Sequence, residues 1–178
     1  MWGVDQTDTS FEFVAGWKGK PFVMPPYWGV RYTRWLNDDW GWAVDFTHSK
    51  AYADDITLAS SGFSVLEFTD GINVLTLNGL RRFGNAGKWT PYVGLGAGIS
   101  IPHVEVTPTT GIDTFEYQYG GLAFQAMVGV DYAFNDKWSV FGEYKMNYVM
   151  LDVDLTSGGW LRTDLVTNAF NVGVSRAF

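Results

Sequence analysis

The chain has 178 residues, of which 47% are apolar, 17% aromatic and 17% charged, and its formal net charge is −7. This length suits one domain, 1–178, and the negative charge argues against nucleic acid as a partner. The mean hydropathy is −0.03 and no apolar run approaches the roughly 18 residues of a membrane helix, which excludes a helical membrane protein. The absence of cysteine is compatible with passage through the periplasm.

The opening residues, Met1 and Trp2, lead directly into polar sequence. We therefore expect that a signal peptide has been removed or that the amino terminus is truncated.

Taken in chain order, the sequence shows a weak alternation of apolar and polar residues at Phe11–Trp17, which prolines at 21, 25 and 26 then interrupt. Clear period-two alternation, the mark of strands, follows in seven runs. These are Tyr27–Trp35, Gly41–Lys50, Ile72–Phe83, Trp89–Ile101, Tyr117–Phe134, Trp138–Leu151 and Leu165–Phe178. In the last run Phe170, Val172, Val174 and Phe178 share one face, and Thr167, Asn171 and Ser175 share the other.

The connections between these runs alternate in length. Short turns at 36–39, 84–88 and 135–137 alternate with long polar loops at about 51–70, 102–116 and 152–164. Aromatic residues flank every short turn, where the interface of a membrane favours them. Short periplasmic turns and long extracellular loops are typical of outer-membrane barrels, and a terminal strand that ends in Phe178 resembles the last strand of such barrels.

The sequence therefore predicts an all-β fold, an eight-stranded antiparallel up-and-down transmembrane β-barrel of the small OmpA-like type. Seven strands are clear, and closure in lipid requires an eighth, which we place within 2–17 as a marginal first strand. Polar inward positions would fill the narrow lumen, with Glu143 and Lys145 as a structural ion pair rather than a pore. The expected lumen side chains are Arg31, Asp45, Thr76, Asn78, Tyr92, Gln125, Asp131, Glu143, Lys145 and Asn171.

Candidate chemistry gathers at the outer ends of the strands, because no nucleophile elbow, phosphate loop or zinc-protease motif occurs. His48 and His103, the two histidines, lie there on the lipid-facing side, among carboxylates that include Glu67, Asp70 and Glu105. His48, His103 and Glu105 are candidates for acid–base catalysis, and His48, His103, Glu67 and Asp70 are candidate ligands of a divalent metal cation. The alternative is ordinary interfacial sequence, whose carboxylates bind the cations that bridge lipopolysaccharide.

His48 is followed by Ser49, a pair that suggests a hydrolase as a further alternative. Outer-membrane lipid A deacylases use His, Ser and an acid on a similar barrel, but with one residue between His and Ser. Adjacent residues in a strand point to opposite faces, which counts against this interpretation.

Several segments resemble the outer-membrane lipid A oxidases of rhizobia and related α-proteobacteria. They are FEFVAGWKGKPFVMPPYWGVR (11–31), DFTHSKAYADD (45–55), VLEFTDGINVLTLNGLRRF (65–83), WTPYVGLGAGISIPHVEV (89–106) and DKWSVFGEYKMNY (136–148). The resemblance covers most of the chain from Phe11, including rim segments on which packing imposes little. It departs from the family at the amino terminus, where members carry a fuller first strand and loop.

The resemblance implies oxidation of the proximal glucosamine of lipid A to 2-aminogluconate with molecular oxygen. Lipid A or lipopolysaccharide and outer-membrane lipids would be the partners, in the bacterial outer membrane. Oxygen as oxidant would ordinarily require a redox metal or organic cofactor, and no motif for one occurs. A non-enzymatic structural or lipopolysaccharide-binding barrel, and a lipid A deacylase that requires Ser49, remain the alternatives.

Overall fold

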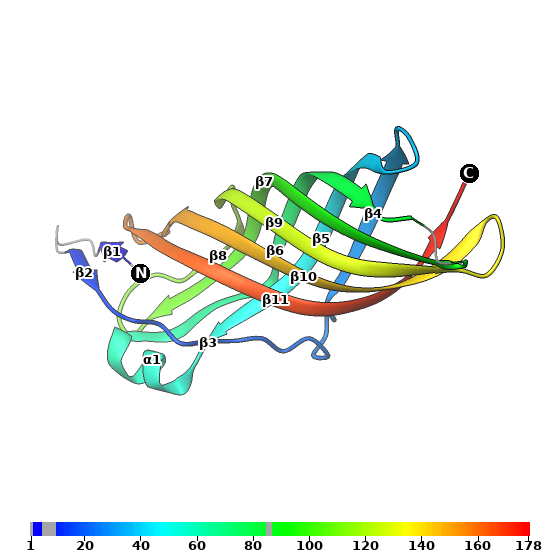
Figure 1. The fold of residues 1–178 in the computed structure, drawn as a ribbon. Coiled ribbons are helices and arrows are strands. Elements are labelled where there is room, and N and C mark those ends of the chain that lie inside the picture. The colour runs from blue at the N-terminus through cyan, green and yellow to red at the C-terminus, as the bar shows by residue number, and fades with distance from the viewer. Residues whose placement is uncertain (1, 5–9, 85–86) are drawn as a thin grey trace.

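The computed structural model describes residues 2–4, 10–84 and 87–178. Long antiparallel strands curl into an elongated barrel, with the amino terminus at one end and the carboxyl terminus at the other (Figure 1). One helix is present in the described part of the chain, and no helix there has the length and apolar character needed to cross a membrane. The elements are β1 Trp2–Val4, β2 Ser10–Glu12, β3 Trp17–Lys18, β4 Trp28–Trp35, β5 Trp40–Ala53, α1 Asp55–Ser61, β6 Phe63–Arg82, β7 Trp89–Pro108, β8 Thr114–Tyr117, β9 Gly121–Ala133, β10 Trp138–Asp154 and β11 Trp160–Arg176.

The strands join in the order β2-β1-β11-β10-β9-β7-β6-β5-β3, with β4 also paired to β5 and β8 to β7. Each consecutive pair is antiparallel, which confirms the predicted all-β up-and-down arrangement. The described residues of the segment 2–17, which was predicted to supply the eighth strand, form only the short strands β1 and β2 and the start of β3, and β4 does not pair with β11 in the described residues. That segment pairs with β11 through β1 and with β5 through β3, in both cases at the outer end.

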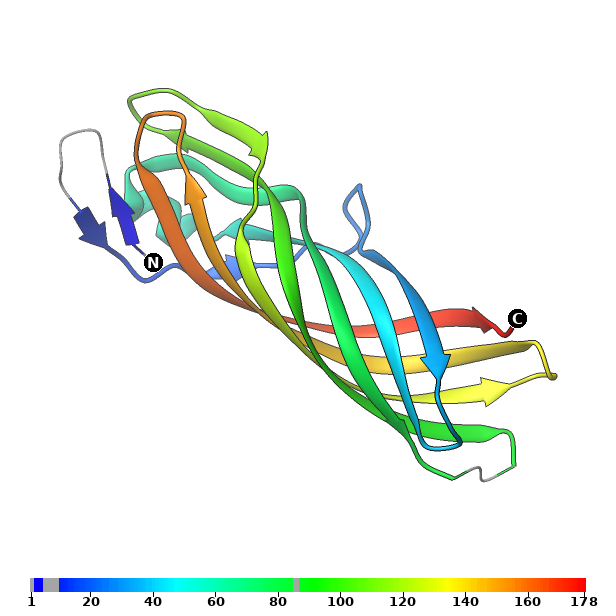
Figure 2. The same ribbon diagram turned by 90° about the horizontal axis from the view of Figure 1, so that it is seen from above.

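The two ends of the barrel differ in the length of their connections, as the sequence predicts. The end near the carboxyl terminus carries the short turns, whereas α1, β8, β1 and β2 gather at the opposite end (Figure 2). We take the latter as the extracellular end. Asp54 caps α1 by accepting a hydrogen bond from the Thr57 amide at 2.8 Å, and Gly62, at φ 75°, ends the helix in the left-handed conformation.

The extracellular loops are shorter than predicted, and this part of the prediction was wrong. β5 continues to Ala53 and β6 begins at Phe63, so the expected loop at 51–70 consists mostly of strand and helix. β7 likewise continues to Pro108, and β10 and β11 leave only 155–159 between them. The reason is a second core above the membrane level, formed by buried residues of the extended strands. It includes Ala51, Leu66, Phe68, Ile72, Val104, Val106, Leu151, Val153 and Leu161.

Apolar side chains also cover the outside of the barrel. Val172 and Phe170 are 87% and 88% exposed, and Leu95 is 72% exposed. A soluble protein rarely exposes such a continuous apolar surface, but a lipid-facing wall requires it. Alternation therefore distributes the sequence as predicted, with the apolar residues toward lipid and the polar residues toward the lumen.

Candidate functional site

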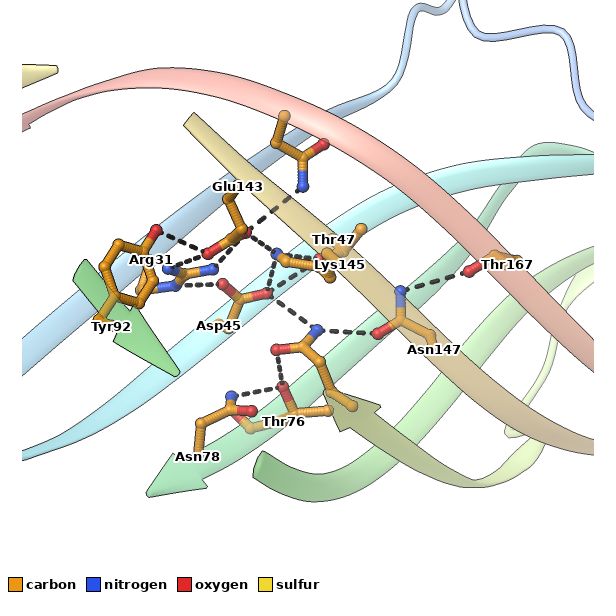
Figure 3. Close-up of polar contacts among 12 residues, drawn as sticks. Arg31, Asp45, Thr47, Thr76, Asn78, Tyr92, Glu143, Lys145, Asn147 and Thr167 are labelled. Atoms are coloured by element: carbon orange, nitrogen blue, oxygen red, sulfur yellow. Dashed lines mark hydrogen bonds and ion pairs between the residues drawn. The ribbon is translucent and has the colours of Figure 1, made fainter. Parts of the chain in front are cut away.

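The lumen holds a network of buried ion pairs (Figure 3). Arg31 of β4 donates to Asp45 at 2.6 Å and, through both terminal nitrogens, to Glu143 at 2.7 and 2.9 Å. Lys145 donates to Asp45 at 2.7 Å. Two cations therefore balance two anions, and the predicted Glu143–Lys145 pair is present at 3.7 Å as the weaker contact in this cluster.

Neutral side chains complete the network. The Tyr92 hydroxyl donates to Glu143 at 2.9 Å, and the Gln125 amide donates to Asn147 at 2.8 Å. Thr76, Asn78 and Thr167 continue the chain of hydrogen bonds in Figure 3. Seven of the ten predicted lumen side chains are thereby confirmed as buried inside the barrel: Asp45, Thr76, Asn78, Tyr92, Gln125, Glu143 and Lys145. Because these charges neutralise one another, the lumen is a stabilising plug and not the candidate reactive site.

A row of side chains on the outer surface is the stronger candidate, and we call it the rim row. Lys18, Tyr52, Glu67, Glu105 and Phe115 pair directly, each with the next, across β3, β5, β6, β7 and β8. Directly opposed residues of antiparallel strands point to the same face. Leu66 and Phe68, on either side of Glu67, are in the inner core, so the rim row faces outward.

Electrostatics in the rim row centre on the two carboxylates. Burial and the neighbouring Glu105 carboxylate raise the pKa of Glu67 above its ordinary range. Thr69 donates to Glu105 at 2.7 Å, which holds that carboxylate in place. Burial and the nearby Glu67 raise the pKa of the Tyr52 hydroxyl, and the Lys20 ammonium lies 4.0 Å from the Tyr52 ring centre. This arrangement gives a base, a phenol and an ammonium on one outward face.

His48 lies on the outward face of β5, as predicted, but is covered. Its Nδ1 is 2.9 Å from the Asn73 amide oxygen, and its ring stacks on Trp28 at 5.9 Å between centroids. Gly71, at φ 116°, packs so closely that a Cβ there would lie 2.3 Å from the imidazole. The His48 Nε2 is buried and makes no hydrogen bond.

His103 lies on the outward face of β7 and is only 3% exposed. The rings of Phe115 and Tyr117, both from β8, enclose it at 4.4 and 4.7 Å. Its Nδ1 is 3.9 Å from the Asp70 carboxylate, an ion-pair distance that leaves Nδ1 without a hydrogen bond. Sequence analysis placed this residue on the correct face but did not anticipate that β8 covers it.

Four of the candidate site residues, the metal candidates Glu67, Asp70 and His103 and the catalytic candidate Glu105, come together as two pairs. Glu67 lies opposite Glu105, and Asp70 lies beside His103, while His48 binds Asn73 instead. Within the described ranges, no group of three or more His, Cys, Asp or Glu side chains is placed to hold a metal ion. The metal site stays a prediction, and we assign no reaction step to it.

Three residues near the rim row escaped sequence analysis. The Lys50 ammonium, 2% exposed, donates to the carbonyl oxygen of Val23 at 2.6 Å, and the Tyr27 hydroxyl donates to the carbonyl oxygen of Lys50 at 2.6 Å. These bonds fix the segment between β3 and β4 against β5. Lys20, from that same segment, thereby reaches Tyr52. The alternation that places His48 outward also places Lys50 and Tyr52 outward when it is continued along β5. The positions of Tyr27 and Lys20 depend on the proline-rich segment between β3 and β4, which has no periodic pattern from which they could be predicted.

A family model matches nearly the whole chain. The model described as the outer membrane protein beta-barrel domain covers residues 3–178. The chain belongs to this outer-membrane β-barrel family. Its members' location, the bacterial outer membrane, is therefore the location of this protein, as predicted from strand alternation and aromatic placement.

A solved structure is similar to the fold of this β-barrel family member. The crystal structure of Neisserial surface protein A (NspA) matches with a TM-score of 0.59, over 99% of this chain and 90% of that chain. The two sequences are 16% identical, so the likeness concerns the fold alone. No curated protein matches the chain.

Proposed function

We propose that this outer-membrane barrel binds the headgroup of lipid A in the outer leaflet and oxidises its proximal glucosamine. The observation that carries the proposal is the outward direction of the rim row, which lies beyond the lipid-facing belt at the extracellular end. Its Glu67–Glu105 pair and Lys20 face the leaflet where lipid A resides. The segments that resemble lipid A oxidases support the choice of reaction.

At a proximal glucosamine whose C1 hydroxyl is free, the reaction moves two electrons and two protons, one from the C1–H bond and one from the O–H bond, to molecular oxygen. Oxygen becomes hydrogen peroxide, C1 becomes the carbonyl of a lactone, and water opens the lactone to the acid. The chain's own part is the proton at the sugar hydroxyl. A carboxylate whose pKa is raised toward neutrality, as that of Glu67 is, suits a general base. Lys20 and Lys18 would hold the phosphates of the lipid.

The direct test is a reaction of the folded protein with lipid A in air, with divalent cations supplied. We expect a mass gain of one oxygen in the lipid, and a loss of at least about 100-fold in rate in Glu67→Gln, the scale on which a general base contributes. Glu116→Gln, an exposed carboxylate of β8, is the matched control and should retain the parent rate. Unchanged lipid mass with the parent protein rejects oxidation, and released fatty acid would indicate deacylation.

Deacylation finds little support in the local geometry. Ser49 is 5% exposed, and neither its Oγ nor the His48 Nε2 makes a hydrogen bond, so the two are not paired as a nucleophile and its base. The double variant His48→Gln with His103→Gln tests whether either imidazole takes part in the reaction. Unchanged product removes the imidazoles from the chemistry, since the rim row retains its carboxylates.

The pH dependence of the reaction supplies a second prediction. Glu67 must be ionised to accept a proton, so activity should fall as the pH falls through its raised pKa. The Glu105 carboxylate helps to raise that pKa, and Glu105→Gln removes this repulsion. We expect the acid limb of the pH–rate profile to move to lower pH in Glu105→Gln. A limb that stays in place, measured with lipid A at saturation, would mean that Glu67 is not the titrating group.

A further inference from the structure

Four cationic side chains lie at the outward face of the barrel, at the end that carries the short turns. We call them the belt cations, and they are Arg34, Arg81, Lys88 and Arg176. Arg81 lies directly opposite Trp40 and Val93, which are exposed on the lipid-facing wall. Arg34 lies opposite Trp42, and Arg176 lies opposite Trp138. Directly opposed residues share a face, so the belt cations lie at the periplasmic boundary of the lipid-facing wall.

Aromatic rings hold three of the belt cations. The guanidinium carbon of Arg81 is 5.2 Å from the ring centre of Trp40 and 5.2 Å from that of Phe83. The Lys88 ammonium is 6.0 Å from the ring centre of Tyr132. The guanidinium carbon of Arg176 is 5.6 Å from the ring centre of Trp138. A ring face attracts a cation but does not replace the carboxylate or phosphate oxygens to which its N–H groups would donate.

The belt cations also lack a carboxylate partner within the part of the chain that the structure describes. The ion pairs found there join residues of the lumen or of the extracellular end, and none includes a belt cation. The outward carboxylates gather instead at the extracellular end, and they include Glu67, Glu105, Asp152 and Asp164. The outward face is therefore cationic at the periplasmic end, although the chain as a whole carries a net charge of −7.

This cationic belt fits the headgroup of an anionic glycerophospholipid. A phosphate diester accepts two N–H groups of one guanidinium at once, and the acyl chains would continue along the apolar wall at Val93 and Leu95. A zwitterionic headgroup brings an ammonium of its own, which the belt cations would repel. We propose that the belt cations bind the phosphates of anionic glycerophospholipids in the periplasmic leaflet, so that these lipids gather around the lower end of the barrel.

Local quenching of a fluorophore tests the proposal, because the chain has no native cysteine to compete for the label. The label is attached to Val93→Cys, opposite Arg81, or to Ile101→Cys, nearer the extracellular end; both parent side chains face outward from β7 and are 39% exposed. The protein is placed in vesicles that mix phosphatidylglycerol and phosphatidylcholine, with bromine on the chains of one lipid at a time. At Val93→Cys we expect local enrichment of phosphatidylglycerol by about fivefold, the scale for one basic side chain at an anionic membrane surface. At Ile101→Cys we expect no enrichment.

Further variants identify the belt cations as the cause. Replacing all four with glutamine should abolish the enrichment at Val93→Cys, and raised salt should weaken it. Arg162→Gln removes a cation at the extracellular end and should leave the enrichment unchanged. Folding is checked first by heat-dependent gel mobility, and Arg81→Gln alone, directly opposite the label, serves where the fourfold variant does not fold.

Two results would overturn the proposal. Equal quenching by the two brominated lipids at Val93→Cys, in folded protein, would mean that the belt cations reach water and not lipid phosphate. Enrichment of phosphatidylglycerol that persists undiminished without the belt cations would assign it to another part of the protein.

Discussion

Replacing Glu143 with leucine should destabilise the barrel by about 3–5 kcal/mol, the cost of breaking a buried pair by removing one partner. The Glu143 carboxylate, 1% exposed, accepts both terminal nitrogens of Arg31 and the Tyr92 hydroxyl. Its loss leaves the guanidinium with Asp45 as its remaining carboxylate hydrogen-bond partner. Urea unfolding in detergent micelles, followed by tryptophan fluorescence, measures the change.

The chain offers a matched control for burial. Arg162 and Asp152 form an ion pair at 2.8 Å, the same distance range, but their side chains are 55% and 53% exposed. Asp152→Asn should cost about 0–1 kcal/mol, because solvent screens the pair and hydrates whichever partner remains. Equal losses of unfolding free energy in Glu143→Leu and Asp152→Asn would contradict the prediction, because they would show that burial of the ion pair adds nothing to the cost of breaking it.

The residues of the lumen network could be predicted from the sequence. Period-two alternation fixes which side chains point inward, so Arg31, Asp45 and Glu143 fall on one face whatever the exact register. Their pairing then follows from charge, since a narrow lumen leaves each ion only its opposite as a neighbour. Asn147 and Thr167 lie on the same inward face by alternation and, being neutral, join the set through hydrogen bonds rather than charge.

The arrangement of the side chains at the rim could not be predicted, because it depends on contacts between residues that are distant in the sequence. Alternation places His103 outward, yet its surroundings depend on β8, in which 114–116 fall in a predicted loop and Tyr117 begins the next predicted strand. The Glu67–Glu105 opposition depends on the register after the irregularity between Glu67 and Ile72. A shift of one residue there would turn the following side chains to the other face, so periodicity alone cannot set the pairing.

The second large effect is expected at Phe68, in the core above the membrane level. Its side chain is completely buried, and the Trp17 ring packs on it at 5.6 Å between centroids. Phe68→Ala should cost about 3–5 kcal/mol through lost burial and the cavity left behind. Ile56→Ala on α1, where the side chain is 80% exposed, should stay within about 0.5 kcal/mol.

The loss should appear first in the N-terminal segment, because β3 pairs with β5 at only two positions, Trp17 and Lys18. Without the Phe68 ring, Trp17 retains those backbone bonds but loses its main aromatic contact. Trypsin cleavage after Lys18 should therefore accelerate in Phe68→Ala well before the barrel unfolds. If the variant is less stable but is cleaved at the parent rate, the Lys50–Val23 hydrogen bond, and not the Trp17–Phe68 contact, keeps this segment in place. Lys20 contacts the Tyr52 ring only while the segment is held, so faster cleavage should accompany a loss of the lipid A binding that we propose for the rim row.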